Sequence, residues 1–162
     1  MRDIYAKIAA CETIVFGTPV YWYGPTALMK SFIDRFVYFN CQTNRSMVRG
    51  KRAVVAIVLE ETHEETWRPL IEFFEKSLGY LEMNFAGTIV VPGIGDKGAI
   101  RQQPQRLEEA YSLGGRLAVR LCRIATWRGV LSGCIRRRFR HHVRGQFLLR
   151  ELVQGVCHRI LR

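Results

Sequence analysis

Residues 16–25 read Phe-Gly-Thr-Pro-Val-Tyr-Trp-Tyr-Gly-Pro, a stretch that combines neighbouring aromatic side chains with residues typical of tight turns. The rings of Tyr21 and Trp22 can form a flat apolar wall, and the backbone of residues 18–23 offers N–H and C=O groups beside it. This combination suits a planar ring with a polar edge, and we assign no side chain here as an acid, base or nucleophile. The sequence therefore predicts a binding site for a ring-shaped ligand. The plainer alternative is that these aromatic residues only cap a sheet.

A strand and a helix should hold this stretch in place. The apolar run Thr13–Phe16 predicts a strand that is buried on both faces and ends at Gly17. Pro25 suits the first turn of the helix that follows, because its missing N–H costs nothing there. The expected core face of that helix comprises Leu28, Met29, Phe32, Ile33 and Phe36. Since ligands of open α/β sheets bind beyond the carboxyl ends of the strands, residues 18–24 occupy the expected location of a site.

Further strands and helices alternate along the chain. Apolar runs at residues 53–59 and 85–91 predict two more strands, with one helix between them and another after the second. Thr62 and Glu65 have the spacing of a capping box at the start of the middle helix, and Gly79 suits its end. This alternation predicts an α/β fold with a parallel sheet and right-handed crossovers.

The stretch from Phe16 to Pro25, with the Met-Lys-Ser-Phe-Ile-Asp-Arg sequence of residues 29–35, resembles the flavodoxin-like family of NAD(P)H-dependent FMN reductases and related iron–sulfur flavoproteins. The resemblance covers about residues 1–120 and implies a flavodoxin-like, three-layer α/β domain around a parallel sheet. It implies FMN and NAD(P)H as cofactors of an oxidoreductase that passes electrons from NAD(P)H through the flavin to a quinone, a free flavin or another small acceptor. The cofactor-binding residues that it implies are Thr18, Pro19, Val20, Tyr21, Trp22 and Gly24.

Several features depart from the family pattern. Residues 1–10 match the helix just before the motif strand, so we expect an N-terminally truncated domain without the family's flavin-phosphate loop. The cysteine cluster of the iron–sulfur branch is also missing. The loop that is small and glycine-rich in relatives here contains Glu60, Glu61, His63, Glu64 and Glu65. Unless they point into solvent, these carboxylates would disfavour a reduced, anionic flavin.

The expected truncation has a structural consequence. In the flavodoxin-like strand order 2-1-3-4-5 the motif strand lies inside the sheet, so the loss of its neighbour would leave Thr13–Phe16 as an apolar edge. An edge of this kind needs a cover. We expect a homo-oligomer or a separate partner chain to provide it, with the C-terminal extension as another candidate.

Charge is distributed unevenly along the chain. The sequence has 25 Lys and Arg against 14 Asp and Glu, a net charge of +11. Residues 1–115 are net neutral, so the whole excess belongs to residues 116–162, where twelve Arg face the single acid Glu151. Within residues 121–162, apolar residues recur at helical spacing beside the arginines, which predicts a basic amphipathic helical extension separate from the domain.

Three roles are open to this extension. Its apolar stripe could pack on the domain, or it could insert into an anionic membrane surface to which each Arg adds attraction. Binding to nucleic acid is less favoured, because no reading motif accompanies the charge. The alternative to an enzyme is thus a non-catalytic, degenerate flavodoxin-like module that acts through its basic tail at a membrane surface or on an acidic partner.

Cysteine usage limits the compartment and the kinds of site. The five cysteines are odd in number and widely spaced, with no Cys-x-x-Cys pair, so we predict neither a disulfide framework nor a metal site. No signal peptide is visible, and no run approaches the roughly 20 apolar residues of a membrane-spanning helix. We therefore expect a cytoplasmic protein.

Overall fold

The computed structural model describes residues 2–126, and the chain divides after Gly95 into two compact units. The second unit begins at Asp96, and its described part contains the 3-10 helix η2 (Ala99–Gln102) and helix α5 (Pro104–Thr126). The basic extension expected at residues 121–162 lies outside the described residues except for the end of α5, and the domain boundary expected at residue 120 stays a prediction. Among the described helices, none combines the length and the hydropathy needed to cross a membrane.

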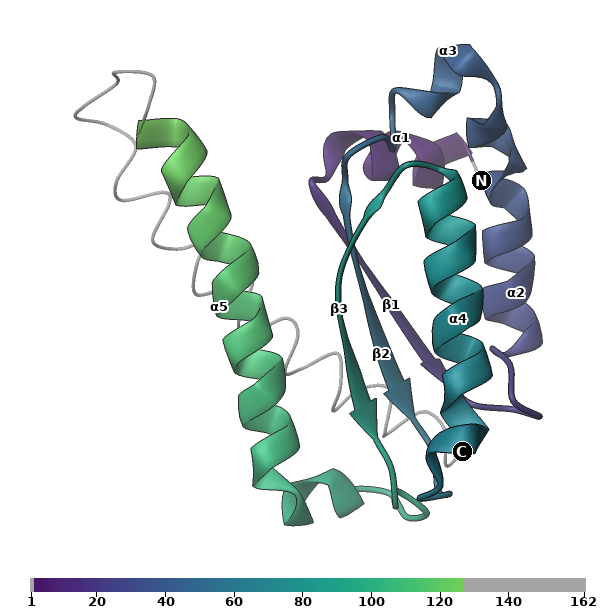
Figure 1. The fold of residues 1–162 in the computed structure, drawn as a ribbon, viewed down its shortest axis with the longest axis vertical. Coiled ribbons are helices and arrows are strands. Elements are labelled where there is room, and N and C mark those ends of the chain that lie inside the picture. Colours follow the sequence, from purple (N-terminus) through teal and green to yellow (C-terminus); the bar gives the residue numbers. More distant parts are fainter. Residues whose placement is uncertain (1, 127–162) are drawn as a thin grey trace. The chain divides into compact units, whose positions relative to one another are not determined.

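Strands and helices alternate in the first unit, which confirms the predicted α/β class (Figure 1). Its elements are α1 (Arg2–Ala10), β1 (Thr13–Pro19), α2 (Ala27–Asp34), the 3-10 helix η1 (Arg35–Asn40), α3 (Gln42–Arg45), β2 (Arg52–Val58), α4 (Glu64–Tyr80) and β3 (Asn84–Val91). Helices α2 and α4 cover one face of the sheet (Figure 1). The second helical layer of the expected three-layer structure stays a prediction.

The three strands form a parallel sheet in the order β1-β2-β3, which confirms the predicted parallel sheet. Arg52 of β2 is in register with Thr13 and with Asn84, and Val58 is in register with Pro19 of β1. The carboxyl ends of the strands are therefore level. The loops that follow these ends emerge at one edge of the sheet, where ligands of open α/β sheets bind.

β1 is an edge strand within the described part of the chain. The expectation that both its faces are buried is wrong: only Phe16 and Thr18 are buried, because they alternate onto the face that packs against the core. The expected end at Gly17 is also wrong, since β1 continues to Pro19. Proline is tolerated here because its missing N–H falls on the free side of an edge strand.

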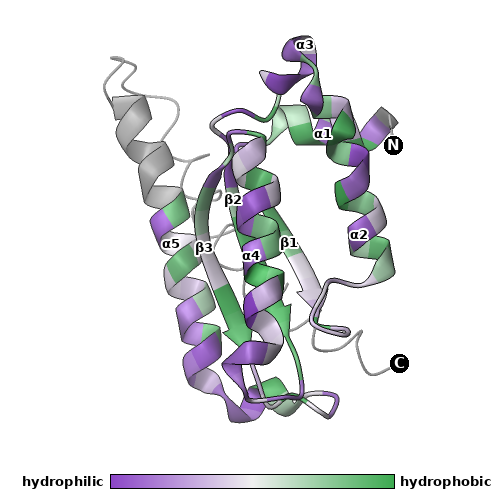
Figure 2. Cartoon of the chain, turned by 45° about the vertical axis from the view of Figure 1, so that its right-hand side comes forward, coloured by the Kyte–Doolittle hydropathy of each residue, from purple (hydrophilic) through white to green (hydrophobic). Residues whose placement is uncertain are grey.

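An apolar core fills the space between the sheet and helices α2 and α4, and Figure 2 shows hydrophobic residues along the strands. Residues Ala53–Val58 of β2 are all buried, as expected for a continuous apolar run in a parallel sheet. The ring centroid of Phe16 lies 5.5 Å from that of Phe74 in α4 and 6.1 Å from that of Phe36 in η1. Helix α1 adds Ile8 to the same core.

Helix α2 begins at Ala27, two residues after Pro25, and Thr26 is its N-cap. The Oγ1 atom of Thr26 accepts a hydrogen bond from the N–H of Met29 at 3.1 Å. Met29 packs on the core as predicted, but the placement of Leu28 on the same face is wrong, since Leu28 is 83% exposed. Leu28 lies about 100° around the helix from Met29, so the orientation that packs Met29 turns Leu28 to solvent.

The start of α4 differs from the expected capping. Its N-cap is His63, which makes no side-chain cap bond, so the predicted capping box of Thr62 and Glu65 is wrong. Thr62 lies one residue before the N-cap position and cannot bond the first turn as a cap does. Glu64 and Glu65 instead occupy the first turn, where their negative charge interacts favourably with the helix dipole.

Helix α4 does not end at the expected Gly79, and a glutamate takes the left-handed position that follows the helix. The helix continues to Tyr80, and Glu82 adopts a left-handed backbone with φ of +58°. The N–H of Glu82 bonds the C=O of Gly79 at 2.9 Å, and the N–H of Met83 bonds the C=O of Leu78 at 3.1 Å. These two bonds form a Schellman motif, in which glycine usually takes the left-handed position.

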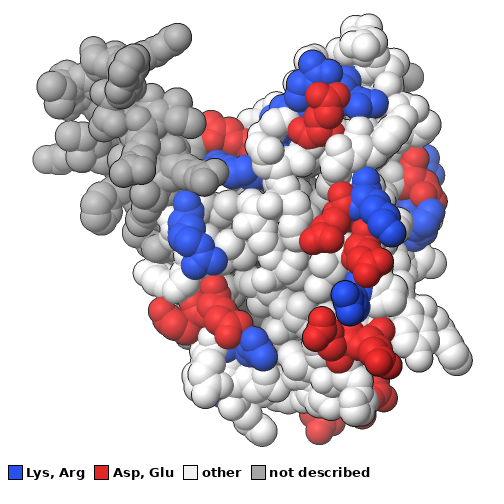
Figure 3. All heavy atoms as spheres, viewed as in Figure 1, with Lys and Arg blue, Asp and Glu red and all other residues white. Residues whose placement is uncertain are grey.

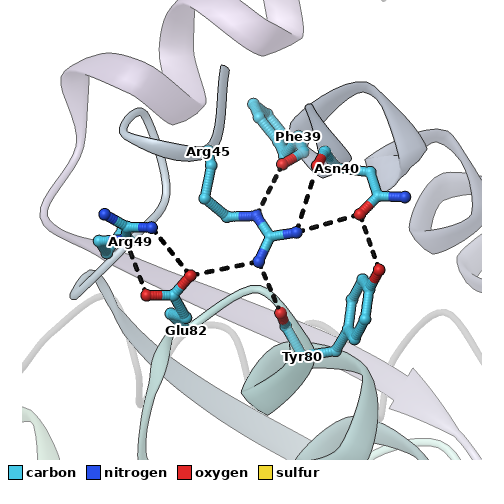
Figure 4. Close-up of polar contacts among 6 residues, drawn as sticks. All are labelled: Phe39, Asn40, Arg45, Arg49, Tyr80 and Glu82. Atoms are coloured by element: carbon cyan, nitrogen blue, oxygen red, sulfur yellow. Dashed lines mark hydrogen bonds and ion pairs between the residues drawn. The ribbon is translucent and has the colours of Figure 1, made fainter. Parts of the chain in front are cut away.

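Glu82 also lies in a polar cluster near the amino ends of β2 and β3 (Figure 4). Its Oε2 lies 2.8 Å from Nε of Arg49, and its Oε1 lies 3.3 Å from Nη1 of Arg45. Arg45 also donates to the carbonyl oxygens of Phe39 and Tyr80 at 3.0 and 2.9 Å. The hydrogen bond from Arg49 and the charges of both arginines lower the pKa of Glu82. The cluster fastens η1 and α3 to the connection between α4 and β3.

Candidate functional site

Thr18 fixes the point at which the chain leaves β1. Its side chain is buried, and its hydroxyl donates to the carbonyl oxygen of Pro19 at 2.9 Å. The same hydroxyl accepts a hydrogen bond from the N–H of Thr26 at 3.3 Å. Because Thr26 is the N-cap of α2, these bonds close the loop between the strand and the helix. Since its hydroxyl closes the loop and the residue lies in the β1–β2 ladder, the role of Thr18 is to position the turn, and the binding of a ligand by Thr18 stays a prediction.

The loop contains a tight turn with Trp22 and Tyr23 at its centre. The N–H of Tyr21 donates to the C=O of Gly24 at 2.9 Å, and the N–H of Gly24 donates to the C=O of Tyr21 at 3.0 Å. Trp22 has φ of +50° and Tyr23 has φ of +63°. These features are those of a type I′ turn, whose central residues are usually Asn and Gly. A left-handed backbone costs bulky residues about 1–3 kcal/mol each, and such strain is concentrated at functional sites.

The aromatic side chains of this turn are exposed. Tyr21 is 51% exposed, Trp22 is 95% exposed and Tyr23 is 57% exposed. The alternative in which these rings cap the sheet does not fit Trp22, whose ring is almost entirely in solvent. Scattered apolar residues are normal on a surface, but three consecutive exposed aromatics form a local apolar patch of the kind that binds ligands or partners.

Backbone groups of the turn are available beside these rings. The N–H of Val20 is taken by the C=O of Val58 at 3.2 Å, and both Tyr21 groups are taken by Gly24. The N–H and C=O groups of Trp22 and Tyr23 make no hydrogen bond to any other residue within the described 2–126 range. The turn therefore offers free donors and acceptors next to an apolar surface, as a planar ring with a polar edge requires.

The loops after β2 and β3 are fastened to each other at the same edge of the sheet. The N–H of Leu59 bonds the C=O of Val91 at 3.2 Å, and the N–H of Ile94 bonds the C=O of Leu59 at 2.9 Å. The N–H of Gly93 bonds the C=O of Glu60 at 3.2 Å. These bonds hold the two loops together beyond the strand ends.

Acidic side chains gather around the start of α4 at this edge (Figure 3). Glu60, Glu61, Glu64 and Glu65 are all exposed, so each carboxylate is hydrated. Because water and salt screen exposed charges, these carboxylates repel a nearby anionic ligand only weakly. Over the part of the chain that the structure describes, no three His, Cys, Asp or Glu side chains come together as a metal site.

Tyr23 and Thr26 belong to this arrangement, although neither is among the predicted binding residues. Tyr23 takes one of the two positive φ values, and no sequence signal points to it because the turn type normally requires Gly there. Thr26 could have been found, since a Thr directly before an amphipathic helix is a common N-cap.

Comparison with known proteins relates these features to a family. Residues 2–113 match the family Flavodoxin_2, which is described by its flavodoxin-like fold. Over 120 residues the chain is 31% identical to the putative NAD(P)H-dependent FMN-containing oxidoreductase YwqN of Bacillus subtilis. That alignment covers 68% of this chain and 63% of the relative, so the chain spans less than two thirds of the relative's length.

Solved structures share the fold. The Trp repressor binding protein from Bacillus subtilis is 28% identical, with a TM-score of 0.60 and coverage of 66% of both chains. The general stress protein 14 from Treponema denticola, solved in complex with FMN, is 17% identical with a TM-score of 0.52. The second match covers 69% of this chain and 72% of the other, and at its level of identity it is evidence of fold alone.

Proposed function

We propose, because this chain belongs to the flavodoxin-like family Flavodoxin_2, that it acts as an FMN-dependent oxidoreductase that passes electrons from NAD(P)H to a small acceptor. The relative YwqN, 31% identical, has NAD(P)H-dependent and FMN-containing oxidoreductase in its name. The chain spans 63% of that relative, so the proposal is argued from the chain's own site and tested on it.

The observation that carries the proposal is the strained, exposed aromatic turn at the carboxyl end of β1. Tyr21 and Trp22 are large apolar neighbours that are exposed side by side, which forms an apolar patch of the kind that ligands cover. Trp22 and Tyr23 keep positive φ values and free backbone groups beside the rings. A flavin has both a flat apolar face and a polar edge, and it fits this pairing of rings and peptide groups.

FMN, when bound, supplies the hydride and electron-transfer chemistry that no side chain can perform. The chain's own part is to bind and to orient. Tyr21 and Trp22 exclude water from one face of the ring, while Thr18, Pro19 and Val20 set the position of the turn. Gly24 closes the turn through its two bonds to Tyr21. We assign no side chain a proton-transfer role.

Titration of the purified full chain with FMN tests the proposal. We expect flavin fluorescence to be quenched, yellow colour to be retained through gel filtration, and NAD(P)H oxidation to accelerate with a quinone. Tyr21→Ala and Trp22→Ala should weaken FMN binding about tenfold, because an aromatic stacking contact is worth roughly 1–1.5 kcal/mol. Tyr80→Ala is the matched control, since Tyr80 is 64% exposed at the opposite end of the sheet.

Two results would contradict the proposal: a colourless preparation that takes up no FMN, and equal losses of binding in Tyr21→Ala and Tyr80→Ala. The first result would favour the non-catalytic alternative, which rests on the concentration of the +11 charge in residues 116–162. Cosedimentation of the full chain with anionic but not neutral vesicles, abolished by high salt, would support that role of the tail.

The acceptor and the location are proposed on narrower grounds. A quinone or a free flavin is planar and apolar enough to approach the exposed aromatic face of the turn. A cytoplasmic location agrees with the free thiols of Cys11 and Cys41 among the described residues, because oxidising compartments favour disulfides. Cell fractionation of the full chain checks the location.

A further inference from the structure

Leu28 is 83% exposed in the first turn of α2. Exposed leucines are ordinary on a protein surface when they stand singly. Leu28 does not stand singly, because the Cα–Cβ bonds of an α-helix are tilted toward its N-terminus and so direct this side chain back toward the loop before α2. The nearest large exposed side chain along that loop is Tyr23, which is 57% exposed.

The chain between Tyr23 and Leu28 is short and is fastened at two points. Their separation in sequence limits the distance between their Cα atoms to about 18 Å. Gly24 makes two hydrogen bonds that close the tight turn, and the N–H of Thr26 donates to the buried hydroxyl of Thr18 at 3.3 Å. Residues 23–28 therefore form one fixed surface element with an exposed apolar side chain at each end, which we call the Tyr23–Leu28 strip.

The Tyr23–Leu28 strip carries no charge. Residues 13–29 contain no Lys, Arg, His, Asp or Glu. The next charged residue, Lys30, is paired with Asp34 one helical turn further along α2. A ligand on the strip therefore gains from apolar contact and not from ion pairing, which favours a neutral, lipophilic ligand.

The area of the strip suits a small molecule. An aromatic side chain buries roughly 150–250 Å² when it is fully covered, so the exposed parts of Tyr23 and Leu28 together come to on the order of 200 Å². A stable protein–protein interface buries about 800 Å² on each partner. The strip alone is too small for a protein partner, whereas a short branched hydrocarbon chain covers it.

We propose that the Tyr23–Leu28 strip binds the apolar tail of the electron acceptor, so that the acceptor is a quinone with a prenyl side chain. This rests on the proposed function, in which Tyr21 and Trp22 bind the flavin and the quinone ring approaches the same turn. The strip begins directly after Trp22, so a quinone ring at the turn has its tail within reach of Leu28. Because the tail is remote from the ring that accepts electrons, its contact adds binding and takes no part in the chemistry.

Steady-state kinetics of the FMN-loaded full chain test this with benzoquinones that share one ring and differ only in the length of their prenyl tail. The wild-type KM should fall about threefold with each added prenyl unit, because even partial burial of its carbon atoms is favourable. Leu28→Ser should raise the KM for the prenylated quinones about threefold relative to the KM for the unprenylated ring. Leu28→Met restores an apolar side chain and should recover the wild-type ratio. Val37→Ser is the matched control, since Val37 is 71% exposed in η1 and lies outside the strip.

Equilibrium binding provides a readout that needs no turnover. Quenching of tryptophan fluorescence by the same quinones, without NAD(P)H, gives a Kd for each tail length. The Kd should fall with tail length in the wild type and in Val37→Ser, and should depend less on tail length in Leu28→Ser. Circular dichroism verifies that each variant is folded.

A wild-type KM and Kd that do not change with tail length overturn this proposal, and so do equal changes in Leu28→Ser and Val37→Ser. In both cases FMN uptake and turnover of the unprenylated quinone leave the proposed function standing. A wild-type chain that takes up no FMN and reduces no quinone contradicts the proposed function, and the assignment of the acceptor tail is then overturned with it.

Discussion

Tyr23 offers a direct test of strain in the turn, through its replacement by Gly and, separately, by Ala. Both substitutions remove the same ring, which is 57% exposed, so the loss of its packing is common to the two variants. Only glycine also removes the Cβ atom that makes the φ of +63° unfavourable. The difference between the two variants therefore isolates the backbone strain.

The expected magnitude follows from two opposing effects. A left-handed backbone costs an L-residue about 1–2 kcal/mol, and the greater freedom of glycine in the unfolded chain offsets about 0.4–1 kcal/mol of that. Tyr23→Gly should thus be more stable than Tyr23→Ala by about 1 kcal/mol, equivalent to roughly 3–6 °C in unfolding midpoint for a domain of this size.

Thermal and urea unfolding followed by circular dichroism measure this difference. Tyr111 is the matched control position, because it is 42% exposed and lies in the interior of helix α5. There, Gly should be less stable than Ala by about 0.5–1 kcal/mol. If Gly is also the less stable residue at position 23, the turn is not strained, and the step from strain to a functional site fails.

Two further predictions concern the polar cluster and the core. Because Arg49 and Arg45 lower the pKa of Glu82 below its ordinary value of 4.5, its contribution to stability is present above pH 4.5 and is lost as pH falls through the folded-state pKa. Urea midpoints of the wild type should therefore fall more steeply below pH 4.5 than those of Glu82→Gln, and parallel profiles would refute this. Phe74→Ala should destabilise the fold by about 3–5 kcal/mol, and Leu28→Ala by less than about 0.5 kcal/mol, because Phe74 is fully buried and Leu28 is 83% exposed. Comparable losses in equilibrium unfolding would contradict the orientation of α2.

The sequence predicts the strands well and their ends poorly. The run at residues 53–59 contains only apolar residues, a pattern that few environments other than a buried parallel strand accept. By contrast, the continuation of β1 to Pro19 depends on the strand's place at the edge of the sheet, which no local pattern records. Glu82, just beyond the end of α4, adopts a backbone conformation that favours glycine. Its bonds to Arg45 and Arg49, which are distant in sequence, could not be read from the local pattern.

The location of the candidate site follows from the sequence, whereas its geometry does not. Residues 18–24 come directly after an apolar run, so their position beyond a strand end is readable from the pattern alone. The positive φ values of Trp22 and Tyr23 are not, since aromatic residues rarely adopt them. The binding of a ligand by Thr18, Pro19, Val20, Tyr21, Trp22 and Gly24 stays a prediction.

The arginine cluster around Glu82 has a consequence for how this protein can change. Its ion pairs join α3 to the end of α4 on the side of the sheet where the strands begin. The aromatic turn and the acidic loop lie on the side where the strands end. Substitutions that reshape the loops at the carboxyl ends of the strands therefore leave this arginine cluster intact. The loops on one side of the sheet can therefore change during evolution while the other side keeps its architecture.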